Sequence, residues 1–115
     1  METQELSQLY WSEFLDALNE KLDNNDVLIV VRNVEGAEQS DLSNSSLLSV
    51  DYDKDSDEIS VLLFGKDFAV KGVKSIEAEF DCDELSGLEI GGKGGCSCLI
   101  RFNHPIHLPR AALAA

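Results

Sequence analysis

The chain has 115 residues, of which 43% are hydrophobic, so it can form one compact domain with a core but not two. Twenty-two acidic residues stand against nine basic ones, and the net charge of −13 repels phosphate backbones and anionic lipid headgroups. Binding of nucleic acid or of a membrane surface through basic residues is therefore excluded. The size scaling of compact domains predicts a radius of gyration of about 13 Å.

The first residues lack the basic start and the apolar core of a secretion signal. The longest aliphatic run, Val27 to Val31, is far shorter than the roughly 18 residues of a membrane span. We therefore expect a cytoplasmic protein. Its cysteines are odd in number, so we expect reduced thiols rather than a disulfide framework.

Apolar residues recur at three- and four-residue steps between Gln4 and Leu22, with polar residues on the opposite side. They are Leu6, Tyr10, Trp11, Phe14, Leu15, Leu18 and Leu22. This pattern predicts an amphipathic helix, with Thr3 as the residue that caps its first turn. Such a helix usually packs on the sheet of its own domain, and a helix that binds a partner is the alternative.

Several strands are predicted after the helix. The β-branched run Val27 to Val31 is typical of a buried central strand, and the polar stretch Glu35 to Ser46 predicts a long connection. Alternating apolar residues on both sides of an Asp-rich break then predict a hairpin. The strands that follow the connection are Leu48 to Tyr52, Ile59 to Leu63, Val73 to Phe80, Leu88 to Ile90 and Cys96 to Phe102.

Together these elements predict an α+β fold, with the N-terminal amphipathic helix packed on an antiparallel sheet or half-barrel of about six short strands. No linker divides the chain, so residues 1–115 are expected to form a single domain. The end of the chain, from Leu108 to Ala115, has no strand pattern. Residues 103–115 are therefore expected to be a C-terminal tail.

Two groups of residues in the first half carry a resemblance. They are the run Trp11, Phe14, Leu15 and Asp16, and the segment from Leu48 through Asp53 and Asp57 to Ile59 and the Ser-Val-Leu that follows it. This pattern resembles a bacterial family of small proteins known only as a domain of unknown function. The resemblance implies an α+β fold and no known activity.

The carboxylates of Asp51, Asp53 and Asp55 alternate as they do at the start of an EF-hand calcium loop. The required Gly and Glu are replaced by Ser56 and Leu62, and both flanks are predicted strands. We therefore expect a hairpin turn in which Asp side chains accept hydrogen bonds from nearby amides, with weak calcium binding as an alternative.

Four zinc-competent residues, Cys96, Cys98, His104 and His107, lie within twelve positions. The two cysteines are one residue apart on a predicted strand, where buried thiols that act as small apolar groups explain them without a metal. A small metal-binding protein is the alternative. A near match to a phosphate-binding loop at Gly87 to Lys93 precedes a strand rather than a helix, which argues against nucleotide binding.

A catalytic nucleophile is not indicated. Cys82 lies between acidic residues, Asp81 on one side and Asp83 and Glu84 on the other, and their negative field disfavours the thiolate. We therefore expect neither enzymatic activity nor a cofactor, and an enzyme with an unrecognised site is the alternative.

The distribution of charge suggests a function. Residues 35–58 and 77–89 hold 14 of the 22 acidic residues. Such concentrated negative charge steers association with a basic partner, although a solubilising surface is the simpler interpretation. We expect a non-enzymatic interaction protein, such as an inhibitor, an immunity-type protein or an adaptor, that binds a basic surface of another protein. Its predicted binding residues are Asp51, Asp53, Asp55, Asp57 and Glu58.

Overall fold

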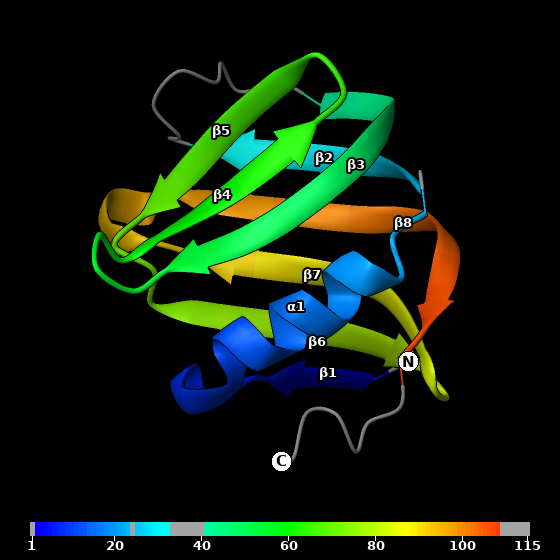
Figure 1. Ribbon diagram of the computed structural model, residues 1–115, viewed down its shortest axis with the longest axis horizontal. Coiled ribbons are helices and arrows are strands. Elements are labelled where there is room, and N and C mark those ends of the chain that lie inside the picture. Colours follow the sequence, from blue (N-terminus) through cyan, green and yellow to red (C-terminus); the bar gives the residue numbers. More distant parts are fainter. Residues whose placement is uncertain (1, 24, 33–40, 109–115) are drawn as a thin grey trace.

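A computed structural model describes residues 2–23, 25–32 and 41–108 (Figure 1). In chain order its elements are β1 (Glu2–Glu5), the 3-10 helix η1 (Gln8–Tyr10), α1 (Trp11–Glu20), β2 (Asp26–Arg32), β3 (Asp41–Asp53), β4 (Glu58–Leu63), β5 (Lys66–Lys71), β6 (Ser75–Asp81), β7 (Glu84–Gly91), the 3-10 helix η2 (Lys93–Gly95) and β8 (Ser97–His107). The strands form one antiparallel sheet in the order β1-β6-β7-β8-β2-β3-β4-β5. The radius of gyration is 12.9 Å, close to the value expected from chain length.

The expected fold class is wrong in two respects. Within the described residues the sheet has eight strands rather than about six, and the helix follows β1 rather than opening the chain. The helix is also shorter than the range predicted for it, Gln4 to Leu22. The chain is extended through Glu5, and α1 begins only at Trp11. Thr3 therefore lies in β1, opposite Glu79 of β6, and caps no helix.

Two expected boundaries are also wrong. The polar stretch from Glu35 was expected to be a connection as far as Ser46, but residues 41–46 belong to β3 and pair with β2. Residues 33–40 lie outside the described part of the chain. The C-terminal tail was expected to begin at residue 103, but β8 continues to His107. Residues 109–115 lie outside the described part of the chain.

The core is one cluster of buried apolar side chains from the helix and the inner faces of the strands. The helix contributes its predicted stripe, with Trp11, Phe14, Leu15 and Leu18 buried, and it contacts β3. It therefore packs on its own sheet. No helix among the described residues is long and apolar enough to cross a membrane.

β3 pairs with β2 through residues 41–46 and then turns away to pair with β4 (Figure 1). Beyond this point Asn19 of α1 takes the place of a neighbouring strand. Its amide oxygen accepts the N–H of Val50 at 2.9 Å, and its amide nitrogen donates to the carbonyl of Val50 at 3.0 Å. One side chain thus satisfies both backbone groups of Val50, on the side of β3 that faces away from β4.

The last strand of this order, β5, ends against the connection between β7 and β8. The N–H of Lys93 donates to the carbonyl of Gly72 at 3.0 Å, so the residue after β5 is bonded to the β7–β8 connection. Gly92 packs so closely there that a Cβ atom on it would lie 2.6 Å from the carbonyl oxygen of Lys71. The sheet therefore curves back on itself at this end.

Candidate functional site

The five acidic residues predicted to bind a partner surround the β3–β4 turn, and we call them the acidic ridge. Asp51 and Asp53 are at the end of β3, Asp55 and Asp57 are in the turn, and Glu58 begins β4. The first three are exposed, while Asp57 and Glu58 are half-buried. The structure therefore brings all five together on one hairpin.

Hydrogen bonds order the turn. The N–H of Asp55 donates to Oδ1 of Asp53 at 2.9 Å, as expected for an Asp-rich hairpin turn. The amide of Asn19 donates to Oδ1 of Asp51 at 3.0 Å. Asp57 has a φ of 56°, in the left-handed region that Asp and Asn adopt more readily than other side chains. The carboxylates thus project from an ordered turn between two strands, not from the helix-flanked loop of an EF-hand.

Tyr52 connects the ridge to the helix. Its hydroxyl donates to Oδ1 of Asp57 at 2.9 Å, and its ring meets Trp11 edge to face with centroids 5.2 Å apart. Burial raises the pKa of Tyr52 above the usual tyrosine value, and the hydrogen bond to the Asp57 carboxylate raises it further. The phenol therefore stays protonated at neutral pH and remains a donor to Asp57.

A pocket of about 530 Å³ lies beside the ridge. It is lined by Gln8, Leu9, Ser12, Glu13, Tyr52 and Lys54. Leu9 is 83% exposed, so its apolar side chain is open to solvent at this pocket. Sequence reasoning missed this pocket because η1 and the end of β3 are more than forty residues apart. The available signal was Leu9 itself, an apolar residue outside the stripe that the helix buries.

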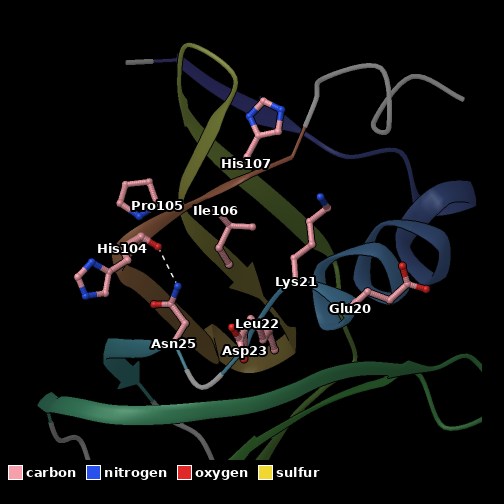
Figure 2. Close-up of a pocket in the computed structure, with 9 residues that line it drawn as sticks. All are labelled: Glu20, Lys21, Leu22, Asp23, Asn25, His104, Pro105, Ile106 and His107. Atoms are coloured by element: carbon pink, nitrogen blue, oxygen red, sulfur yellow. Dashed lines mark hydrogen bonds between the residues drawn. The ribbon is translucent and has the colours of Figure 1, made fainter.

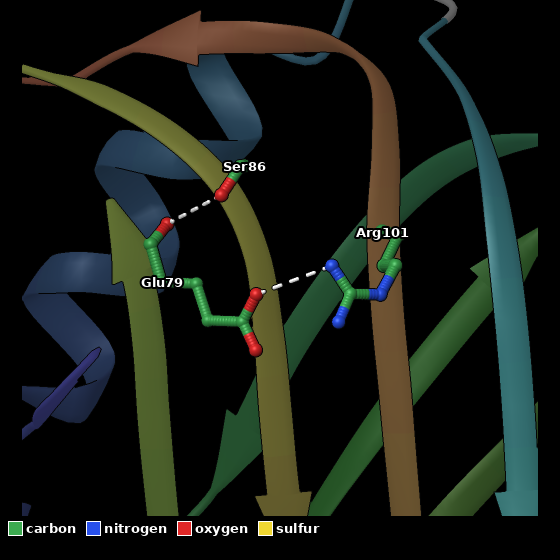
Figure 3. A network of polar contacts seen from close by, with 3 residues as sticks. All are labelled: Glu79, Ser86 and Arg101. Carbon is green, nitrogen blue, oxygen red and sulfur yellow. Dashed lines mark hydrogen bonds and ion pairs between the residues drawn. The ribbon is translucent and has the colours of Figure 1, made fainter. Parts of the chain in front are cut away.

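The second acidic stretch, residues 77–89, follows β6 and β7. Glu79 pairs with Gly87 across these strands, and Gly87 pairs with Arg101 of β8. Because Gly87 has no side chain, Glu79 reaches over it and forms an ion pair with Arg101 at 3.3 Å (Figure 3). The hydroxyl of Ser86 donates to the carbonyl of Glu79 at 3.2 Å (Figure 3). A base from another strand thus partly neutralises this stretch.

The four zinc-competent residues occupy different surroundings along β8 and just before it. Cys98 is fully buried on the inner face of β8, and burial raises the pKa of its thiol to about 12. Cys96 is half-buried, whereas His104 and His107 are exposed near the far end of β8. Nowhere in the described ranges do three or more His, Cys, Asp or Glu side chains form a group that could hold a metal ion. Cys82 is an exposed free thiol in the β6–β7 turn.

Both histidines line a second pocket, of about 690 Å³, between the end of α1 and the end of β8 (Figure 2). Lys21, Glu20 and Asp23 also line it, so its charges are mixed. The amide nitrogen of Asn25 donates to the carbonyl of His104 at 2.8 Å (Figure 2). Its buried Oδ1 has no hydrogen-bond partner among the described residues. The pocket is open to solvent.

No curated protein and no solved structure matches this chain. One family model does match, and it covers residues 2–111. The match therefore extends over nearly the whole chain, not only over the first half that carries the resemblance. The chain belongs to the family described as "Family of unknown function (DUF5335)".

Proposed function

We propose that the protein is a non-enzymatic interaction protein, an inhibitor, immunity-type protein or adaptor, whose acidic ridge binds a basic surface of another protein. Five carboxylates and only one ammonium group, that of Lys54, lie between residues 51 and 58. Such a concentration of one charge raises the rate at which an oppositely charged partner arrives. The free cysteines fit a reducing compartment, so we place this function in the cytoplasm.

The pocket beside the ridge is the observation that carries the proposal. Protein interfaces take most of their binding energy from a few side chains that fill desolvated pockets, with charged residues around them. Here Leu9 and the ring of Tyr52 supply apolar walls, and Asp57 is bonded directly to Tyr52. A partner that inserts one apolar or long basic side chain into this pocket also brings its own positive charges against the ridge.

The alternatives have no comparable support among the described residues. A metal-binding protein needs its ligands close together, and Cys98 is buried in the core while both histidines are exposed. An enzyme needs an activated nucleophile or an acid–base pair in a pocket. Cys98 stays protonated at neutral pH, and Cys82 lies in an acidic, exposed turn.

Affinity capture from a native lysate, with identification by mass spectrometry, supplies a partner whose association kinetics test the proposal. Changing Asp53, Asp55 and Asp57 together to Asn should slow association by about tenfold or more and flatten its dependence on salt. Asn retains an Oδ1 that accepts the same hydrogen bonds, so the turn should stay folded. Leu9→Ser should accelerate dissociation, because the apolar wall of the pocket is lost.

The matched control removes the same charge elsewhere. Asp81, Asp83 and Glu84 are exposed at and beside the β6–β7 turn. Asp81→Asn, Asp83→Asn and Glu84→Gln together should change the association rate much less than the ridge variant. Equal effects of the two triple variants would mean that only net charge matters. An acidic partner, or binding indifferent to both the ridge variant and Leu9→Ser, would contradict the proposal.

A further inference from the structure

We draw no further inference here: the strongest candidate, the exposed apolar side chains of Leu48, Leu62 and Phe64 at one end of β3 and β4, carries none, because nothing in the described part of the chain shows what covers them.

Discussion

At the scale of single residues, burial decides chemistry that composition leaves open. Cys96 and Cys98 alternate with Ile100 and Phe102, and this pattern predicts that all four face inward. Cys98, Ile100 and Phe102 are buried, whereas Cys96 is only half-buried against the core. The thiol of Cys98 behaves as a small apolar group. Cys98 is close in sequence to two histidines and could have been a metal ligand, but its side chain is part of the core.

The raised pKa of Cys98 predicts a loss of stability in alkali. Its thiol titrates near 9 when unfolded and at about 12 in the fold, so above about pH 9 only the unfolded state loses the proton. The stabilisation is complete below pH 9 and is lost as the pH rises toward 12. Between about pH 8 and 10 the contribution of Cys98 to the free energy of unfolding should fall by about 1 kcal/mol.

Urea denaturation at the two pH values measures this loss. The variant Cys98→Ala lacks the thiol, so its free energy of unfolding should fall less over the same pH interval than that of the wild type. The cavity it leaves lowers stability at both pH values and cancels from the comparison. Identical pH dependence in the two proteins would show that the Cys98 thiol is accessible to water.

Asn19 is the second residue whose role depends on the fold. Asn19→Ala removes the partner of the Val50 N–H and of the Val50 carbonyl, which lie where β3 has left β2. Leaving two partly buried backbone groups unpaired should cost about 2 kcal/mol in the free energy of unfolding. Glu20→Ala, an exposed change on the next helical position, should cost less than about 0.5 kcal/mol. Equal costs in thermal or urea denaturation would refute this role for Asn19.

At the scale of elements, the spacing of apolar residues in the sequence identified the helix and the strands that bury several of them. The helix stripe and the strand pairs around residues 50 and 60 were visible in this way. β1 was not visible, because all four of its residues are polar and exposed, and its pairing with β6 depends on backbone hydrogen bonds. β5 buries only Phe68 and Val70, so its alternation is too short to distinguish from a loop.

The contact between β5 and the β7–β8 connection gives a prediction about an element junction. A methyl group on Gly92 would lie 2.6 Å from the carbonyl oxygen of Lys71 and 2.8 Å from a methyl group of Val70. Gly92→Ala should therefore lower the free energy of unfolding by about 2 kcal/mol, because backbone must move apart.

Gly94→Ala is the matched control in the same connection. No atom lies within 4 Å of its Cβ position, and only its φ of 67° opposes a side chain. It should cost about 1 kcal/mol. If urea denaturation ranks the two variants in the opposite order, close packing at Gly92 does not hold this end of the sheet together.

At the scale of the whole molecule, charge and apolar surface are arranged on one outer face. The acidic ridge lies at one end of the outer face of β3 and β4, and the exposed side chains of Leu48 and Leu62 lie toward the other. The second acidic stretch lies on β6 and β7, where Arg101 reaches Glu79. The ridge variant and the control variant at β6 and β7 therefore remove charge from separate parts of the molecule.

The acidic ridge could be found from the sequence because its five members lie within eight residues and a turn keeps neighbours together. The pocket beside it could not, because Leu9 and Tyr52 meet only when η1 packs against the end of β3. The outward position of Leu48 could not be found either, because it depends on a bulge in β3, and a one-residue shift of register reverses which side chains face outward.

By itself the sequence determined the charge of the protein, the buried face of its helix and the hairpin that carries the acidic ridge. Each of these depends on composition or on residues close together in the chain. Only the tertiary structure decided that polar β1 is the edge strand beside β6 and that Arg101 reaches Glu79. It also decided that Asn19 of α1 bonds to β3 beyond the point where β3 separates from β2. These features depend on pairings between distant segments, which local periodicity does not encode.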